Sequence, residues 1–333
     1  MLAGNGLSDL SSQNEESAIS GPAESFGDRV AEHVLGRQSQ LLLGLDPDPA
    51  RLWPHALELV GGVDEPSAPP AALAARAVTA HCRLVIDAVA EHCVGVKPQL
   101  ACFERLGAPG WAALEEVVAH ARAAGLLVIA DAKRGDVDVS ASAYGQAFFE
   151  GTPTPFGPVA GLGADAMTVS PWLGGDSLDP LIDAARNQAG GVFVLARTSN
   201  PGARDLQELE LRNGGTVSLS AAAMIARLGA AGIGRAGLSD VGAVVGATAP
   251  ERLADLRAAM PHTVFLIPGV GAQGGRVEDL GPVFTPGVAA GLISVSRGIV
   301  YAFEHEGGDP VAAAAREARR LRDLLWTLVS KSR

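Results

Sequence analysis

Eight short apolar runs follow one another along this chain, each ending at a glycine, a proline or a polar residue. Each run is too short for an ordinary helix. Most are rich in leucine or β-branched residues without alternation, as in strands buried on both faces of a parallel sheet. The runs are residues 41–45, 94–96, 127–130, 166–170, 192–196, 243–247, 264–267 and 292–295.

Ala-rich amphipathic segments separate these runs, so the chain is expected to be an α/β protein. Helices are predicted over 71–93, 111–125, 218–229, 250–260 and 310–330. Eight strand-then-helix units in a chain of this length indicate a single-domain (β/α)8 TIM barrel. A doubly wound sheet is the main alternative, and length alone does not separate the two. We expect the barrel over residues 25–333, after a polar, disordered tail over residues 1–24.

The composition restricts the partners that the chain can bind. Its formal net charge of −11 argues against nucleic acid, although a local group of cations could still bind a small anion. Its three cysteines form no C-x-x-C pair and favour a reducing cytoplasm. The first residues are expected to make a poor signal peptide, and no later apolar run reaches about 18 residues, so no membrane contact is expected. The seven histidines are scattered, so a metal site built from histidines has little support.

Two insertions and one glycine motif lie between the predicted elements. Residues 61–70 are expected to lengthen a surface loop, and residues 200–217 form a candidate lid after the fifth run. Residues 232–237 satisfy the pattern G-x-G-x-x-G. A dinucleotide fingerprint leaves a strand and opens a helix, whereas this motif follows a helical segment and precedes a strand. We therefore interpret it as a helix-ending turn.

Charged residues follow the second and third runs, where a barrel places its reactive groups. Asp131 and Lys133 are two positions apart on one strand, so both are expected on the same face. Lys97 comes from the adjacent strand, while Gly135 permits a turn that carries Asp136 away. Any one of these charges could belong to a structural salt bridge. A buried group of four would add little net stability, which favours a catalytic role.

The ends of the fifth, seventh and eighth runs have the character of a nucleotide site. Barrels commonly bind phosphate with the loops after strands seven and eight. Here those loops contain the glycine-rich segment 268–275 and Arg297, whose N–H groups suit phosphate oxygens. Ser199 follows the fifth run in a segment that could read the edge of a planar base, although the same segment also suits a turn.

Taken together, these motifs resemble the orotidine 5'-phosphate decarboxylase family, and in particular its bacterial subgroup with longer chains. The core is D-A-K-R-G-D after the third strand, preceded by K-P-Q one unit earlier. The order of the motifs also agrees with that family from about Leu41 to Tyr301. The remaining matching motifs are G-L-D-P, T-V-S-P-W-L-G-G-D, R-T-S-N-P-G and P-G-V-G-A-Q-G-G.

The resemblance implies a role for each candidate residue. Lys133 would protonate C6 of the pyrimidine, Asp131 would lie beside the departing carboxylate, and Asp136 would enter the partner's site in a homodimer. Lys97 would complete the charge network. Asp46 and Lys97 would contact the ribose, Ser199 the pyrimidine, and Gln273 and Arg297 the phosphate. The implied substrate-binding residues are Asp46, Val137, Ser140, Ser199, Pro268, Gln273 and Arg297.

The resemblance also implies a cytoplasmic enzyme that converts orotidine 5'-phosphate to UMP with no cofactor and no metal. Val137 stands where the family usually has isoleucine, and Ser140 where it has threonine. One alternative is a magnesium-dependent barrel enzyme for sugar phosphates, such as a hexulose-phosphate synthase. Lys97 disfavours it, because an acidic metal ligand would be expected there. The second alternative is a catalytically silent nucleotide-binding protein.

Overall fold

The computed structural model describes residues 24–60, 68–212, 214–271 and 273–330. Eight parallel strands form a closed barrel in chain order, so the predicted barrel is confirmed and the alternative of a doubly wound sheet is wrong. The strands are β1 (Leu41–Leu45), β2 (Gly95–Pro98), β3 (Leu127–Arg134), β4 (Ala166–Val169), β5 (Gly191–Arg197), β6 (Val241–Val245), β7 (Phe265–Ile267) and β8 (Gly291–Val295).

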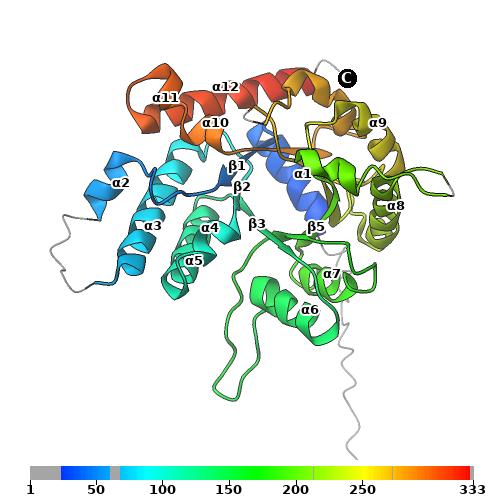
Figure 1. The fold of residues 1–333 in the computed structure, drawn as a ribbon, viewed down its shortest axis with the longest axis horizontal. Coiled ribbons are helices and arrows are strands. Elements are labelled where there is room, and N and C mark those ends of the chain that lie inside the picture. Colours follow the sequence, from blue (N-terminus) through cyan, green and yellow to red (C-terminus); the bar gives the residue numbers. More distant parts are fainter. Residues whose placement is uncertain (1–23, 61–67, 213, 272, 331–333) are drawn as a thin grey trace, which may run out of the picture.

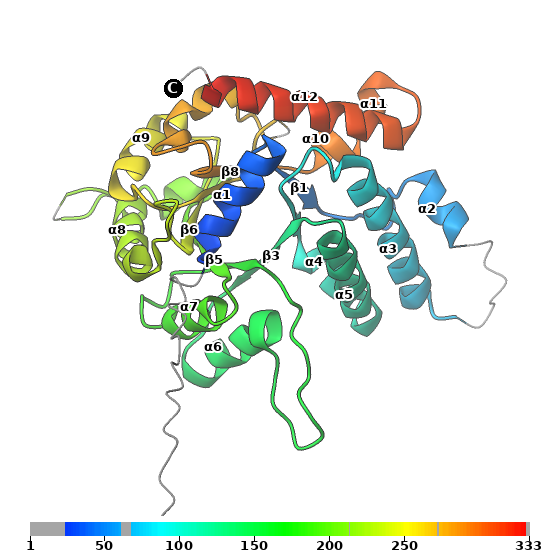
Figure 2. The same ribbon diagram turned by 180° about the vertical axis from the view of Figure 1, so that it is seen from behind.

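Helices surround the barrel and connect its strands (Figures 1 and 2). All five predicted helices are present, with ends that differ by a few residues. After β7 the chain forms a 3₁₀ segment instead of an α-helix, because Pro282 interrupts it. The helices are α1 (Phe26–Arg37), α2 (Pro54–Leu59), α3 (Pro70–Val89), α4 (Leu100–Glu104), α5 (Ala108–Ala123), α6 (Asp138–Gly145), α7 (Asp179–Arg186), α8 (Val217–Gly229), α9 (Pro250–Ala259), α10 (Arg297–Val300), α11 (Phe303–Glu306) and α12 (Pro310–Ser330), with shorter turns at η1 (Gln146–Glu150), η2 (Pro201–Asp205), η3 (Ala230–Gly232) and η4 (Val277–Phe284).

Strand side chains alternate between two apolar cores. Leu41 and Leu43 of β1 pack outward against the helices, whereas Leu42 packs inside the barrel. Helix α1 closes the amino-terminal end of the barrel, where Phe26 lies edge-on to Phe193 with ring centroids 5.9 Å apart. The amino-terminal end of the barrel is therefore filled with side chains, which leaves the carboxyl-terminal end of the strands as the place for a pocket.

The glycine motif at 232–237 is a turn between α8 and β6, as predicted. It begins where η3 ends, and the N–H of Gly234 donates to the Leu238 carbonyl at 2.9 Å. A Cβ at Gly232 would lie 1.9 Å from the Asp240 carboxylate, so close packing explains this glycine without any nucleotide.

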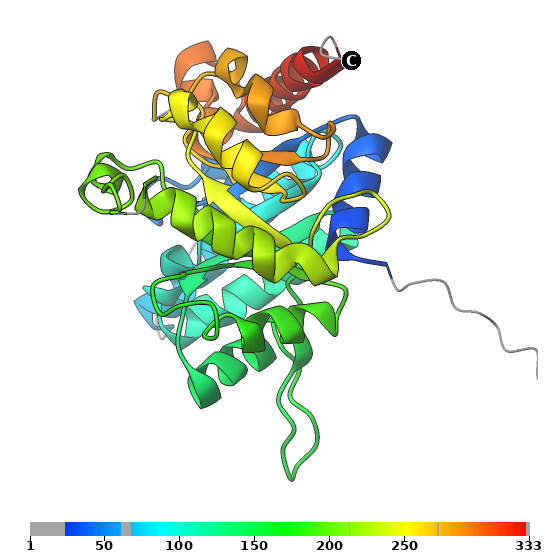
Figure 3. The ribbon, with the colours of Figure 1, turned by 90° about the vertical axis from the view of Figure 1, so that its right-hand side faces the viewer.

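Two loops that the sequence predicts, and one hairpin that it does not, connect elements of the barrel. The candidate lid at 200–217 begins with η2 and contains an antiparallel bridge between Glu210 and Thr216. Residues 61–67 of the surface insertion, and residues 1–23 of the predicted tail, lie outside the described residues. Between η1 and β4 a hairpin bridged at Thr152 and Val159 projects from the barrel (Figure 3). No helix in the described ranges is long and apolar enough to cross a membrane.

Candidate active site

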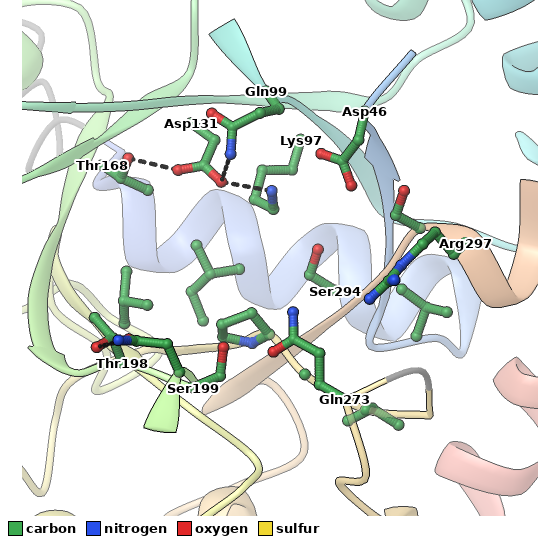
Figure 4. Close-up of a pocket in the computed structure, with 18 of the residues that line it drawn as sticks. Asp46, Lys97, Gln99, Asp131, Thr168, Thr198, Ser199, Gln273, Ser294 and Arg297 are labelled. Atoms are coloured by element: carbon green, nitrogen blue, oxygen red, sulfur yellow. Dashed lines mark hydrogen bonds and ion pairs between the residues drawn. The ribbon is translucent and has the colours of Figure 1, made fainter. Parts of the chain in front are cut away.

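A pocket of about 390 Å³ opens at the carboxyl-terminal end of the barrel (Figure 4). It contains every candidate residue from the sequence except Asp136, Val137 and Ser140. Val244 and Leu266 give it apolar walls. The lining residues are Asp46, Lys97, Gln99, Asp131, Lys133, Thr168, Thr198, Ser199, Asn200, Val244, Leu266, Pro268, Gly269, Val270, Gln273, Ser294, Val295, Ser296, Arg297 and Gly298.

The Asp131 carboxylate is the centre of the charge cluster, and it accepts hydrogen bonds from four side chains. Lys97 Nζ lies 2.7 Å from Asp131 Oδ2, and Lys133 Nζ lies 2.5 Å from Asp131 Oδ1. Gln99 Nε2 donates to Oδ2 at 3.2 Å, and Thr168 Oγ1 donates to Oδ1 at 2.9 Å (Figure 4). Both carboxylate oxygens are therefore fully engaged, which fixes the orientation of Asp131.

The cluster keeps Asp131 ionised although the carboxylate is buried. Asp131 and Lys97 are 7% and 6% exposed. Burial alone would raise the pKa of Asp131, but the ammonium groups of Lys97 and Lys133 outweigh it and lower the pKa to about 2. Within one chain, two ammonium groups therefore surround a single carboxylate. Such a site can stabilise negative charge that develops on a bound ligand.

An irregularity in β3 places Lys133 in this cluster. Ala130 pairs with Met167 and Arg134 pairs with Val169, so three residues of β3 face a single residue of β4. Lys133 at the end of this bulge has a left-handed backbone, with φ of +48°. Simple strand alternation predicted that Asp131 and Lys133 share a site, but the structure achieves this through the bulge.

Gln99 and Thr168 also belong to the cluster, although the strand-end pattern did not identify them. Thr168 lies within the fourth apolar run, and Gln99 belongs to the K-P-Q motif, in which only Lys97 was predicted to act. A single polar residue inside a strand buried on both faces was the available signal for Thr168, since buried polar groups need partners.

The opposite side of the pocket carries the groups expected to bind phosphate and base. Arg297 begins α10 and is separated from the end of β8 by one residue, whereas Asp46, which follows β1, lies on the Lys97 side of the pocket (Figure 4). Gln273 reaches the pocket from the glycine-rich loop after β7. Gly269 in that loop has φ of +96°, and a Cβ there would come within 3.1 Å of the side chains of Gln273 and Ser199. The glycine thus lets this loop approach the site closely.

Asp136, Val137 and Ser140 lie beyond the pocket of their own chain. Asp136 Oδ1 accepts the backbone N–H of Val137 at 2.8 Å, while Val137 is 47% exposed and Ser140 is exposed on α6. Within the described part of the chain, no group of three or more His, Cys, Asp or Glu side chains is arranged to hold a metal ion.

Comparison with known proteins connects this geometry to one family. The sequence model of the orotidine 5'-phosphate decarboxylase / HUMPS family matches residues 39–316. The orotidine 5'-phosphate decarboxylase of Deinococcus radiodurans is 42% identical over 307 residues, covering 90% of this chain and 96% of its own. That of Rhodopirellula baltica is 41% identical over 281 residues, covering 84% and 90%. The structure of Leishmania donovani OMP decarboxylase superposes with a TM-score of 0.64 at 32% identity, covering 90% and 99%.

Proposed function

The chain belongs to the orotidine 5'-phosphate decarboxylase / HUMPS family, and we infer that it is the carboxy-lyase that converts orotidine 5'-phosphate to UMP in pyrimidine biosynthesis. The observation that carries this function is the group of Lys97, Asp131 and Lys133 at the carboxyl ends of β2 and β3. It supplies fixed positive charge where the reaction generates negative charge.

We propose that Lys133 is the proton donor of this reaction. Loss of CO₂ from C6 leaves an electron pair in an sp² orbital that the pyrimidine ring cannot delocalise. An ammonium group beside C6 stabilises this carbanion and then transfers a proton to it, which yields UMP and a neutral amine. The Lys133 side chain is 46% exposed, so the amine can regain its proton from solvent.

The residue type supports this assignment. The chain contains only three lysines among its 26 basic residues, and two of them are Lys97 and Lys133. A guanidinium group holds its proton too tightly to donate it, whereas an ammonium group can act as an acid. Lysine at these two positions is therefore chemically distinct from the arginines that predominate elsewhere.

Preorganised charge must supply most of the rate enhancement, because a unimolecular reaction gains little from gathering reactants. We propose that Asp131 lies beside the departing carboxylate and holds both ammonium groups in place. Binding energy from the remote phosphate, through Gln273 and Arg297, would help to stabilise the transition state. Asp46 and Lys97 would bind the ribose hydroxyls, while Ser199 and Pro268 would face the pyrimidine.

We further propose a homodimer in which Asp136 completes the partner's site, with Val137 and Ser140 beside it. The loops after β3 and β4 start side by side, because the Ser170 N–H donates to the carbonyl of Arg134, the last residue of β3, at 2.7 Å. Apolar side chains on these two loops and at the start of α6 are exposed: Val137 by 47%, Val139 by 83%, Trp172 by 69% and Leu173 by 49%. Exposed apolar side chains on the loop that carries Asp136 and on the loop after the neighbouring strand are typical of a subunit interface.

The function is tested by adding purified protein, freed of metal with EDTA, to orotidine 5'-phosphate and following the loss of substrate absorbance. We expect full turnover, since the proposed mechanism uses no metal or cofactor. Turnover of a hexulose phosphate that depends on Mg²⁺ would favour the other branch of the family. UMP binding without any decarboxylation would indicate a silent nucleotide-binding protein.

We also propose a cytoplasmic location, which the three free cysteines support.

Replacing Arg297 by alanine should lower kcat/KM, because a charged partner of the phosphate is lost. The decrease should correspond to a loss of about 2–4 kcal/mol of transition-state stabilisation. Orotidine, the nucleoside that lacks the phosphate, should be decarboxylated at the same rate by the wild type and by Arg297→Ala. Arg276→Ala is a matched control, because Arg276 lies on the same loop as Gln273 but near Glu278 at 3.6 Å, outside the pocket. Unchanged kcat/KM for the phosphorylated substrate in Arg297→Ala would place the phosphate site elsewhere.

A further inference from the structure

Thr168 is the single residue of β4 that faces the bulge in β3. Its side chain is buried, and its hydroxyl accepts a hydrogen bond from the backbone N–H of Lys133 at 2.9 Å. The same hydroxyl donates to Asp131 Oδ1 at 2.9 Å, and this oxygen also accepts from Lys133 Nζ. The contacts form a closed ring that runs from the backbone of Lys133 to its own ammonium group.

The conformation of Lys133 requires such support. Its φ of +48° is uncommon for a residue with a Cβ. The bulge also removes its N–H from the regular ladder, so this donor needs another partner. The long side chain is 46% exposed and can rotate about several bonds. Its position therefore depends on where the backbone starts and where Asp131 is held, and Thr168 contacts both.

We propose that Thr168 is a positioning residue that fixes Lys133 for proton transfer to the substrate. The proposal rests on the decarboxylation inferred above. A hydroxyl is the group required, because it accepts from Lys133 and donates to Asp131 at once. Valine has the same branched shape but can do neither. Serine can do both, although it lacks the methyl group that restricts the rotamer of threonine in a strand.

The test compares Thr168→Val with Thr168→Ser in steady-state decarboxylation. We expect Thr168→Val to lower kcat by about 100-fold, because displacement of a catalytic group by about 1 Å has effects of this size. Its KM and its affinity for UMP should stay within about threefold of wild type, since the ribose and phosphate contacts remain. Thr168→Ser should regain most of the rate. Thr79→Val, a similar change at a buried threonine on α3, should leave kcat unchanged.

The activity of the wild-type protein distinguishes a failure of the proposed decarboxylase function from a failure of the positioning role of Thr168. An inactive wild type would overturn the proposed function itself. With an active wild type, a kcat in Thr168→Val above about a third of normal would overturn the positioning role. The positioning role would also be overturned if Thr168→Ser did not regain the lost kcat, or if Thr168→Val lost UMP affinity in parallel with kcat. If Thr168→Val does not fold, Thr168→Ala compared with Thr168→Ser provides the same test, because alanine adds no atoms to the buried site.

Discussion

Replacing Lys133 by alanine is expected to lower kcat by at least about 10³-fold, while UMP binding stays within about tenfold of wild type. The variant loses the proton donor and, with it, one of the two positive charges that contact Asp131. The groups assigned to phosphate and ribose are untouched, so product affinity should survive. Stopped assays at high enzyme concentration, together with UMP titration, measure both quantities. Turnover above a few per cent of wild type would exclude Lys133 as the proton donor.

Lys133→Arg separates the two roles of the ammonium group. Arginine keeps the positive charge but retains its proton at any accessible pH. If proton transfer is the main role, the arginine variant should be nearly as inactive as alanine. If charge alone matters, arginine should regain a large part of the rate. Lys331→Ala is a suitable control, because Lys331 is the only other lysine in the chain and lies near its end.

The barrel was predictable because its strands are buried on both faces. The runs at 41–45 and 292–295 are continuous and apolar, and β1 and β8 occupy nearly these residues. Charged residues just past such runs must lie at the open end of the barrel, which brings Lys97 and Asp131 together across neighbouring strands. Local pattern and barrel topology together were enough to identify the centre of the site.

Contacts that depend on local strand irregularity could not be predicted. Periodicity treats β3 as a regular strand, whereas the bulge changes the direction of Lys133 and brings Thr168 into the cluster. Thr168 itself occurs within an apolar run, so its role is visible only when its hydrogen-bond partners are known. The place of Asp136 is a second example, because its own chain does not bring it into the pocket.

Asp136 makes the homodimer testable with two inactive proteins. Lys133→Ala and Asp136→Asn should each be inactive alone, and should regain activity when unfolded and refolded together. The reason is geometric: Asp136 pairs with the Val137 N–H outside the pocket of its own chain, beside exposed apolar side chains. The proposed site takes Lys133 from one subunit and Asp136 from the other.

The expected recovery follows from counting the sites in the mixture. In a mixed dimer, one site lacks both groups, while the other has Lys133 from the Asp136→Asn chain and Asp136 from the Lys133→Ala chain. Random association of equal amounts makes half of the dimers mixed, so about a quarter of wild-type activity should return. Each variant refolded alone is the control. If Asp136 served the site of its own chain, every site would remain defective, and the mixture would be no more active than these controls.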